Sequence, residues 1–478
     1  MIPGSEMAVV DRNAEALGVA RKQLMESSGN AVARAVEDLV DPDASVTIVA
    51  GRGNNGGDAL VAARFLGGYD LRILLLGRAE TITTEIAREN WEALQRAEYD
   101  AREVRDSSAV RLGEPDLFVD AMLGTGIQGS LREPAATAAH RMNDREIPVL
   151  SVDVPSGLDA ETGDLAANAV EADRVVTFHE TKPGLAPLDA DVTVADIGIP
   201  EAAEAFVERG DLLRLGRDLR SHKGENGEVL VIGGGPYVGA PALSAQAALR
   251  AGADLVRVTC PTAVSHEIQG YREDLIVRPM EGRKFEPAHV GPVLEFAARH
   301  DTVVIGPGLG DDQETLEAAR AIIEGYDGTA VVDADALQAV PGIETEATLV
   351  CTPHQGELVR MGGQTAEGWR ERRDLVESFA DDLGHTLLVK GHYDVVSDGE
   401  TTRVSRTGNA GMTVGGTGDV LAGVTGALAA VREPIHAAAI GAYVNGRAGD
   451  IVRDERGDGL VASDMLDAIP DAMRVDWP

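Results

Sequence analysis

The chain has 478 residues, 44% of them hydrophobic, a length that exceeds one ordinary hydrophobic core and favours two domains. Its net charge is −36, from 79 acidic and 43 basic residues, and a field of that sign disfavours binding to nucleic acids or anionic membranes. Aromatic residues make up only 4% of the chain, which argues against a module that stacks nucleic-acid bases.

The first half alternates between predicted helices and short apolar strands. Spaced apolar residues predict one or two helices over Ala14–Val40 and another over Ala59–Leu66. Runs of β-branched and other apolar residues predict strands at Ser45–Ala50, Leu71–Leu76, Leu117–Val119, Val149–Val152, Arg174–Phe178 and Val192–Asp196. Continuous apolar strands between helices are typical of a parallel sheet that is covered on both faces.

Glycine-rich loops follow three of these strands: Gly51–Asp58 (GRGNNGGD), Asp120–Ser130 (DAMLGTGIQGS) and Ser151–Gly163 (SVDVPSGLDAETG). Each loop supplies a carboxylate at a strand end, and these are Asp58, Asp120 and Asp153. Each loop alone could be a plain turn. Ligands of open parallel sheets bind at the carboxyl ends of the strands, so we expect the three loops to form one pocket. The glycine spacing differs from that of the dinucleotide-binding fingerprint.

The polar residues of these loops suggest an oxygen-rich site. Asn55, Asp120 and Ser156 offer hard oxygen ligands that suit K⁺, Mg²⁺ or Ca²⁺, whereas zinc would require histidines or cysteines. Asp153 is the best candidate for acid–base chemistry, because it directly precedes a Pro-Ser-Gly turn. Lys182 is one of only five lysines in the chain. It is either a charge-balancing residue of the pocket or an ordinary exposed lysine.

A family resemblance covers about residues 10–185. The segments Asp11–Val36, GRGNNGGD, DAMLGTG, SVDVPSGLDAETG and TFHETKPGL, in this order, resemble the NAD(P)HX epimerase family. The resemblance implies a Rossmann-like domain that interconverts the R and S epimers of hydrated NADH and NADPH. It implies a K⁺ site at Asn55, Asp120 and Ser156. The implied substrate contacts are Asn54, Asn55, Gly56, Gly57, Asp58, Gly124, Thr125, Gly126, Ile127, Gln128, Gly129, Ser130 and Asp153. Ala59 stands where the family usually has glycine, which is a small change.

The second half begins after a charged stretch, Pro200–Arg220, that is predicted to be helical and is followed by a polar break. We place the boundary near residue 215, which gives domains 1–215 and 216–478. Strands are predicted at Glu228–Ile232, Leu255–Thr259, Val303–Ile305, Ala330–Asp333, Ala347–Thr352 and Thr386–Val389. The two halves share no close internal repeat, so they are expected to be different α/β domains.

The most informative segment of the second half is Gly408–Gly423 (GNAGMTVGGTGDVLAG), in which glycines surround the carboxylate of Asp419. A predicted helix, Val420–Val431, follows it. Backbone N–H groups at such a helix start attract phosphate oxygens, and a carboxylate among them could take a proton from a substrate hydroxyl. The alternative is a flexible turn with a helix cap.

Other unusual residues of this half follow its predicted strands, in the loops Gly233–Pro241, Gly306–Gly310, Asp333–Leu337, Thr352–Glu357 and Lys390–Asp394. Lys390 is expected to meet a nucleotide phosphate. His354 is either a contact to a substrate phosphate or ring, or a structural residue. Asp333 and Asp335 either cap helices or contact a ligand.

These loops, over about residues 220–460, resemble the ADP- or ATP-dependent NAD(P)HX dehydratases of the ribokinase-like fold. The resemblance implies conversion of the S hydrate to NAD(P)H. In bacteria and archaea the donor is ADP, which yields AMP and phosphate. Implied nucleotide contacts are Lys390, Gly391, His392, Tyr393, Asp394 and Gly418. Implied substrate contacts are Ala240, Gly308, His354 and Asp419, and Mg²⁺ is expected to accompany the nucleotide.

We therefore expect a bifunctional repair enzyme that acts on hydrated NADH and NADPH. The alternatives are a ribokinase-like kinase for a small molecule such as a vitamin alcohol, and a nucleotide sensor or scaffold without activity. The protein is expected to be cytoplasmic, because no signal peptide or apolar span is found, and it could form homo-oligomers. Many acids and few lysines are typical of salt-loving organisms such as halophilic archaea, or of an acidic protein from a GC-rich genome. Cys260 and Cys351 predict no disulfide framework.

Overall fold

The computed structural model describes residues 1–126 and 129–475, and its internal contacts divide the chain into two compact units, Met1–Ala203 and Glu204–Pro478. The sequence suggested a boundary near residue 215. The contacts assign residues 204–215 to the second unit, where β8 (Phe206–Val207) pairs with β17 (Thr402–Ser405). The stretch Pro200–Arg220, which was predicted to be helical, is not one continuous helix. It forms a short helix, α6 (Ala202–Ala205), then β8 and a 3-10 helix.

The first unit contains a seven-stranded parallel sheet in the order β3-β2-β1-β4-β5-β6-β7. Its strands are β1 (Ser45–Ala50), β2 (Asp70–Leu76), β3 (Ala101–Val104), β4 (Leu117–Ala121), β5 (Val149–Val152), β6 (Arg174–Phe178) and β7 (Asp191–Ala195). The strand order reverses between β1 and β4. The glycine loops that follow these two strands therefore lie at the switch point where ligands of such sheets bind.

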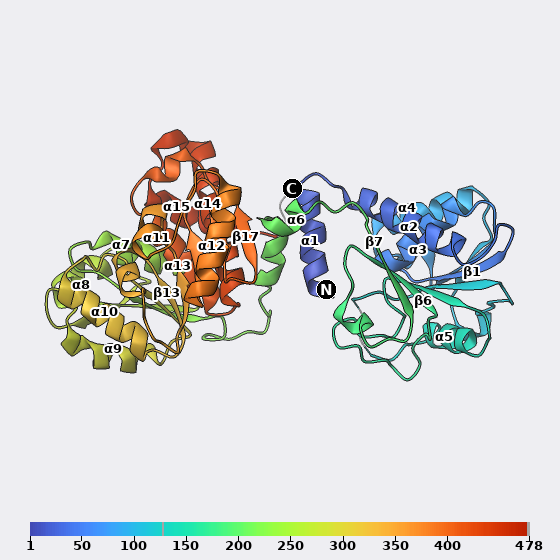
Figure 1. Cartoon of the computed structure of the whole chain (residues 1–478), viewed down its shortest axis with the longest axis horizontal. Helices are drawn as coiled ribbons and strands as arrows, with labels where there is room; N and C mark the ends of the chain where they lie inside the picture. Colours follow the sequence, from blue (N-terminus) through green and yellow to red (C-terminus); the bar gives the residue numbers. More distant parts are fainter. Residues whose placement is uncertain (127–128, 476–478) are drawn as a thin grey trace. The chain divides into compact units, whose positions relative to one another are not determined.

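Helices cover both faces of this sheet, with α2, α3 and α4 on one face and α5 on the other (Figure 1). The helices are α1 (Gly4–Ala16), α2 (Arg21–Glu37), α3 (Asn54–Phe65), α4 (Glu85–Arg96) and α5 (Ala135–Asn143). A close approach at the switch point requires glycine, because a Cβ added to Gly51 would lie 1.8 Å from the carbonyl oxygen of Met122.

The second unit contains a ten-stranded sheet in the order β11-β10-β9-β12-β13-β14-β15-β16-β17-β8. Its longer strands are β9 (Glu228–Ile232), β10 (Leu255–Pro261), β11 (Ile276–Met280), β12 (Thr302–Ile305), β13 (Thr329–Val332), β14 (Thr348–Cys351), β15 (Thr386–Val389), β16 (Asp394–Ser397) and β17. The pairs from β11 to β15 are parallel, and β15, β16 and β17 are paired antiparallel. The predicted α/β class is thus confirmed for both halves.

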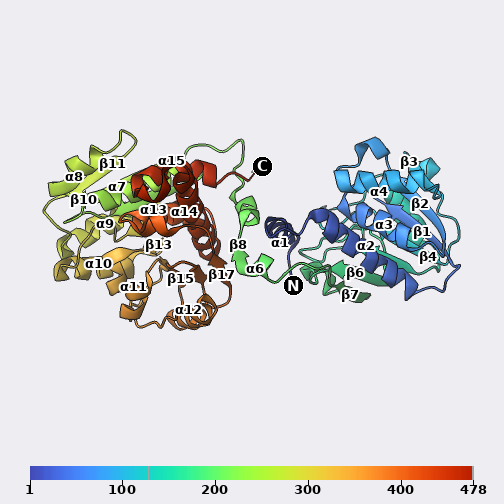
Figure 2. The same cartoon turned by 90° about the horizontal axis from the view of Figure 1, so that it is seen from above.

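Figure 2 shows α13, α14 and α15 on one face of this second sheet, and α10 and α12 on the other. The helices are α7 (Gly239–Arg250), α8 (Thr262–Gln269), α9 (Val290–Ala297), α10 (Gln313–Gly325), α11 (Gln355–Arg360), α12 (Trp369–Leu383), α13 (Thr417–Ala429), α14 (Pro434–Arg456) and α15 (Ala462–Ala472). No helix in the described part of the chain is both long and apolar enough to span a membrane.

Helix α13 packs unusually close to its neighbours, because small residues face them. A Cβ added to Gly423 would lie 2.0 Å from the carbonyl oxygen of Ser244 in α7, and one added to Gly426 would lie 2.3 Å from Val304 in β12. Such close packing fixes the start of α13, and with it Asp419, against the rigid sheet.

Candidate active sites

Asp120, at the carboxyl end of β4, is the centre of a buried oxygen cluster in the first unit. Its carboxylate accepts hydrogen bonds from the Ser156 hydroxyl at 2.6 Å, from the Ser156 backbone N–H at 2.8 Å and from the Ser151 hydroxyl at 2.9 Å. Burial raises the pKa of Asp120 above its ordinary value, although the hydrogen bonds from Ser156 oppose that shift.

Asn55 reaches the same cluster from the first turn of α3. Its side-chain amide donates to the carbonyl oxygen of Leu123 at 3.0 Å, and the Leu123 backbone N–H donates to the Ser156 hydroxyl at 3.0 Å. The side-chain oxygen of Asn55 is buried and has no hydrogen-bond partner among the described residues. An orphaned oxygen beside a carboxylate and a hydroxyl fits a hard cation such as K⁺, which prefers oxygen ligands.

Asp153 follows β5 and is paired with the buried Lys182. The Lys182 ammonium lies 3.2 Å from a carboxylate oxygen of Asp153, and the Thr177 hydroxyl donates to the same oxygen at 3.0 Å. Lys182 is only 1% exposed, and its ammonium also donates to the carbonyl oxygens of Phe178 and Glu180. Lys182 is therefore a charge-balancing residue, and the alternative of an exposed surface lysine is wrong.

Asp153 also has a left-handed backbone, with a φ of 65°. A residue other than glycine pays about 1–3 kcal/mol for such a conformation, which persists only where the surroundings enforce it. The backbone conformation of Asp153 therefore indicates that its surroundings fix the orientation of the side chain at a cost in local stability.

Two further carboxylates share this electrostatic environment. Asp58, in the second turn of α3, is buried, and burial, with the charges of Asp153 and Asp11, raises its pKa well above the ordinary value. Asp11, on α1, has its pKa raised to about 6 by burial and by the charge of Asp153, while His179 and Lys182 oppose the shift. The sequence pointed to Asp58 and Asp153 but assigned no role to Asp11.

The remaining predicted contacts of the first unit lie on the loops around this cluster. A Cβ added to Gly124 would lie 3.2 Å from the side chain of Asn55, which brings the second glycine loop onto the first. Asn54, Gly126, Gly129 and Ser130 are exposed. Gly56 and Gly57 are buried and Thr125 is half-buried, whereas Ile127 and Gln128 lie outside the described residues.

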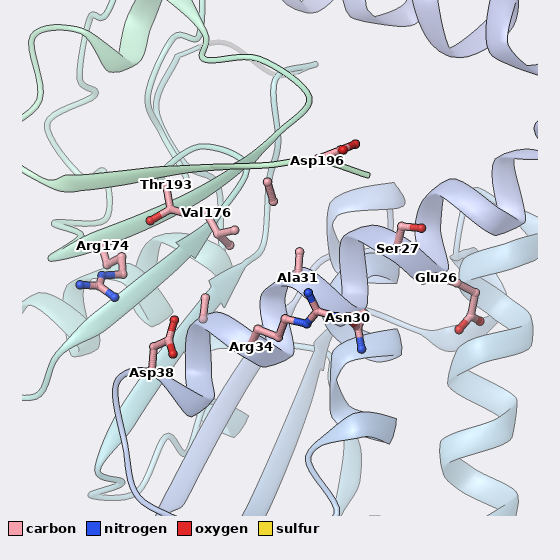
Figure 3. A pocket seen from close by; sticks show the side chains of 12 residues that line it. Glu26, Ser27, Asn30, Ala31, Arg34, Asp38, Arg174, Val176, Thr193 and Asp196 are labelled. Atoms are coloured by element: carbon pink, nitrogen blue, oxygen red, sulfur yellow. The ribbon is translucent and has the colours of Figure 1, made fainter. Parts of the chain in front are cut away.

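A separate pocket of about 580 Å³ lies between α2 and the strands β6 and β7. Figure 3 shows Asn30 and Arg34 of α2 on one side of it and Arg174 and Thr193 of the two strands on the other. None of the predicted site residues that the structure describes lines this pocket.

In the second unit, Asp419 lies in the first turn of α13, which begins at Thr417, three residues earlier than predicted. Gly416 precedes the helix with a φ of 99°, a conformation that suits glycine. Burial and the charge of Asp333 raise the pKa of Asp419 to about 7, while Lys390 lowers it. A carboxyl with such a pKa can exchange protons near neutral pH.

Lys390, which follows β15, binds the neighbouring carboxylates. Its ammonium lies 2.9 Å from a carboxylate oxygen of Asp333 and 3.9 Å from one of Glu357. A Cβ added to Gly418 would lie 3.4 Å from this ammonium, so the lysine directly contacts the start of α13. Burial lowers the pKa of Lys390, but the charges of Asp333 and Glu357 outweigh burial and raise it. The lysine is therefore positively charged.

Asp333 holds this lysine in place instead of capping a helix. It is 2% exposed and also accepts a hydrogen bond from the Thr352 hydroxyl at 2.7 Å, and its side chain makes no capping bond. Asp335 is half-buried, and burial and the charge of Asp311 raise its pKa.

His354 caps α11, because its Nδ1 accepts hydrogen bonds from the backbone N–H groups of Gly356 and Glu357. Its side chain is 55% exposed, and Nε2 lies 3.4 Å from a carboxylate oxygen of Glu357. Nδ1 is thus occupied by the helix cap, whereas Nε2 faces the carboxylate of Glu357.

The Lys390–Asp394 segment borders a pocket of about 440 Å³. The rings of Trp369 and Tyr393 are stacked there at 5.6 Å, and the guanidinium of Arg372 donates to the carbonyl oxygen of Tyr393. The pocket is lined by Gln355, Glu367, Gly368, Trp369, Arg372, His392 and Tyr393. Burial raises the pKa of Asp394 to about 7, although a backbone hydrogen bond from Gly391 opposes the shift.

Two further predicted contacts, Gly308 and Ala240, lie beyond the ends of β12 and β9. Gly308 has a φ of 72°, and an added Cβ would lie 2.2 Å from the carbonyl oxygen of Tyr237. Only glycine allows the loops after these two strands to approach so closely. Ala240 lies in the first turn of α7.

Comparison with known proteins identifies both halves. Residues 229–471 match the family model described as NAD(P)H-hydrate dehydratase, and residues 21–184 match the model described as YjeF-related protein N-terminus. The bifunctional NAD(P)H-hydrate repair enzyme of Methanothermobacter thermautotrophicus is 42% identical over 98% of this chain and 94% of its own. The chain belongs to the bifunctional NAD(P)H-hydrate repair enzyme family.

Further matches agree with this membership. The repair enzyme of Pyrobaculum aerophilum is also 42% identical, over 99% of this chain and 98% of its own. The solved structure of a hypothetical protein from Streptococcus mutans matches with a TM-score of 0.50 and 22% identity, over 56% of this chain and 98% of its own, and this likeness concerns the fold alone.

Membership in the repair enzyme family confirms the resemblance stated for both halves. The chain is an enzyme, and the repair reading is supported over a ribokinase-like small-molecule kinase and over a sensor without activity. Three residues that the structure brings to the two sites were not predicted to act there, namely Asp11, Glu357 and Arg372. For Glu357 a signal existed, because it stands three residues after His354 in the spacing of a capping box.

Proposed function

We propose that the first unit interconverts the R and S epimers of hydrated NADH and NADPH, and that the second unit dehydrates the S epimer at the expense of ADP. The observation that carries this proposal is the grouping of Asp419, Lys390 and Asp333 at the start of α13. A proton acceptor, a fixed positive charge and free backbone N–H groups at one place suit phosphoryl transfer to an alcohol.

The proposed dehydration starts with the hydroxyl group of the hydrated nicotinamide ring. Asp419 takes the hydroxyl proton while the oxygen attacks the terminal phosphoryl group of ADP, and AMP leaves. The N–H groups of the first turn of α13 stabilise the charge on the transferring phosphoryl oxygens. The new phosphate ester then departs as inorganic phosphate, because the electron pair of the ring nitrogen helps to expel it. The ring is left as an iminium ion, and loss of a proton from the adjacent ring carbon then gives NADH or NADPH.

The nucleotide is proposed to lie along Lys390–Asp394 and Gly418. The neighbouring pocket of about 440 Å³ has the size of a small-ligand site, and its stacked rings of Trp369 and Tyr393 suit a planar base. Mg²⁺, which neutralises phosphate charge when it is bound, would be held by the nucleotide and by the carboxylate oxygens near Lys390.

For the first unit we propose that Asn55, Asp120 and Ser156 hold K⁺. The side-chain oxygen of Asn55 supports this assignment, because it is buried and has no hydrogen-bond partner within residues 1–126 and 129–475. The ion would contribute positive charge for binding the substrate's phosphate groups. Asp153 is the proposed proton-transferring group of the same pocket, and Lys182 holds its carboxylate in place.

Removal of K⁺ is expected to slow epimerisation. Replacing K⁺ by a tetraalkylammonium ion should lower the rate of R-epimer consumption by about tenfold or more. Mutation of residues that support the ligands of a metal has effects of this size. The rate is measured with isolated R epimer and ADP in both salts. Dehydration of isolated S epimer serves as the control and should not change. Equal R-epimer rates in both salts would argue against the ion site.

The rate of S-epimer dehydration is expected to rise with pH and to reach half of its maximum near pH 7. Asp419 accepts a proton only when it is ionised, and its pKa is raised to about 7. Below that value the rate should fall about tenfold per pH unit. The measurement is the initial rate with saturating ADP from about pH 5 to about pH 9. A flat profile over this range would contradict a role for Asp419 as base.

The proposed function is tested with a mixture of R and S hydrated NADH, supplied with either ADP or ATP. The reappearance of NADH absorbance measures repair directly. ADP is expected to sustain complete recovery, with AMP as product. Phosphorylation of a vitamin alcohol without recovery of NADH would instead favour the kinase alternative.

A further inference from the structure

Helix α1 forms a wall of the proposed epimerase site. At its start, the backbone N–H of Ile2 donates to the carbonyl oxygen of Thr181 at 2.9 Å, and that of Gly4 donates to the carboxylate of Glu161 at 2.8 Å. A Cβ added to Gly4 would lie 3.1 Å from the side chain of Thr125. The start of α1 is therefore in contact with the loops that follow β4, β5 and β6, which also carry Asp153 and Lys182.

The other end of α1 is fixed as well, so the face that it turns to these loops is defined. The side-chain amide of the buried Asn13 donates to the carbonyl oxygen of Ala203 at 3.0 Å. Asp11 lies seven residues after Gly4, which is two turns further along the same face of the helix. Asp11, which is half-buried, accordingly lies on the face of α1 whose start contacts these loops.

The electrostatic partners of Asp11 agree with this orientation. Apart from burial, its ionisation is influenced by Asp153, His179, Lys182 and Arg21, and Asp11 in turn influences Asp58. Asp11 and Asp58 are thus both close enough to Asp153 to feel its charge, and the ammonium of Lys182 contacts Asp153 at 3.2 Å. Three neighbouring carboxylates cannot all be ionised beside one ammonium without strong repulsion, so the cluster keeps a proton near neutral pH.

We propose that Asp11 is the second catalytic group of the epimerase site and acts as the proton donor to the substrate while Asp153 acts as the base. This inference rests on the epimerase function proposed above. Asp153 is paired with the ammonium of Lys182 at 3.2 Å, whereas Asp11 has no ion pair within 4.0 Å among the described residues. Carboxyl groups in different environments next to each other are the usual arrangement of an acid and a base.

The proposed epimerisation proceeds by opening and closing the hydrated nicotinamide ring. Asp153 removes the hydroxyl proton of the hydrated ring, and the electrons of that O–H bond form a carbonyl group. The bond between this carbon and the ring nitrogen breaks, and its electron pair goes to the nitrogen, which takes the proton of Asp11. The open aldehyde rotates. The nitrogen then attacks the opposite face of the carbonyl carbon, returns its proton to Asp11, and the oxygen takes the proton back from Asp153.

The test uses the full-length chain with the substitution Asp11→Asn. Consumption of isolated R epimer with ADP should fall by about 100-fold or more, as expected for loss of a general acid. Dehydration of isolated S epimer should keep the wild-type rate. The matched control is Glu92→Gln on α4, because Glu92 is exposed and pairs with Arg96, so its loss should not affect either rate.

A pH profile separates catalysis from a structural role. Asp11 donates a proton only in its protonated form, so wild-type epimerisation should decline as the pH rises above about 6. Asp58, Asp153, Lys182, His179 and Arg21 surround Asp11 and remain in all variants. Asp11→Asn should lack this decline, and Asp11→Glu should restore part of the rate together with the decline.

The outcomes are distinct. A wild-type rate and an unchanged profile in Asp11→Asn would overturn the role of Asp11 and leave the epimerase function intact. A slow Asp11→Asn variant that keeps the decline would also overturn it, because the loss would then be structural. If the wild-type protein does not epimerise at all, the proposed function itself is wrong.

Discussion

Asp419→Asn is expected to abolish ADP-driven dehydration while epimerisation continues. The amide keeps the size of the side chain but cannot accept the hydroxyl proton, and loss of a general base typically costs about 10²–10⁴-fold in rate. The measurement is the initial rate of NADH formation from isolated S epimer with saturating ADP. Interconversion of the epimers, followed in the same sample without ADP, should proceed at the wild-type rate.

Unfolding does not explain the expected loss in this variant. The pKa of Asp419 is raised in the folded protein, so its ionised form destabilises the fold at pH values above its ordinary pKa near 3.8. The neutral amide removes that penalty, so the melting temperature at neutral pH should not fall. A matched control is Asp467→Asn on α15, whose side chain is 76% exposed. Dehydration at the wild-type rate in Asp419→Asn would remove Asp419 as the base.

Asp153→Asn is expected to stop use of the R epimer and to leave the S epimer unaffected. The substitution removes the proposed base and leaves the ammonium of Lys182 without its carboxylate partner. Consumption of isolated R epimer with ADP should fall by about 100-fold or more. Isolated S epimer should be dehydrated at the wild-type rate, because its reaction takes place in the second unit.

The matched control for this prediction is Asp164→Asn, which changes an exposed carboxylate that accepts a hydrogen bond from the Thr162 hydroxyl. It should leave both rates unchanged. The rate of spontaneous epimerisation without protein is subtracted. If Asp153→Asn still consumed both epimers at normal rates, the assignment of Asp153 would be wrong.

Much of the fold could be predicted because the central strands are continuous apolar runs. Ser45–Ala50 and Glu228–Ile232 are almost wholly buried, and short β-branched runs of this kind are typical of central strands in a parallel sheet. Strands β16 and β17 were missed although each buries three of its four residues, whereas two other missed strands have weaker patterns. β3 (Ala101–Val104) buries only Val104, and β11 (Ile276–Met280) buries none of its residues. Edge strands like these are held by backbone pairing, which sequence patterns do not reveal.

The candidate sites could be predicted where a chemical group lies at the end of a strongly apolar strand. Asp120 lies near the end of β4, and Lys390 directly follows β15. Pairings across long sequence separations could not be predicted. Asp333 and Lys390 are 57 positions apart, and nothing near Asp333 indicates that it binds a lysine instead of capping a helix. Asp11 likewise lies in an ordinary amphipathic helix, and only the folded chain brings it near Asp153.

The central claim is that one chain carries both steps of the repair. Its most direct test is to incubate the purified protein with isolated R epimer of hydrated NADH and ADP, and to measure NADH, AMP and phosphate together. All of the R epimer is expected to become NADH, with one AMP and one phosphate formed for each NADH. This conversion should be faster than spontaneous epimerisation allows. R epimer that persists while added S epimer is dehydrated, or a complete absence of NADH, would contradict it.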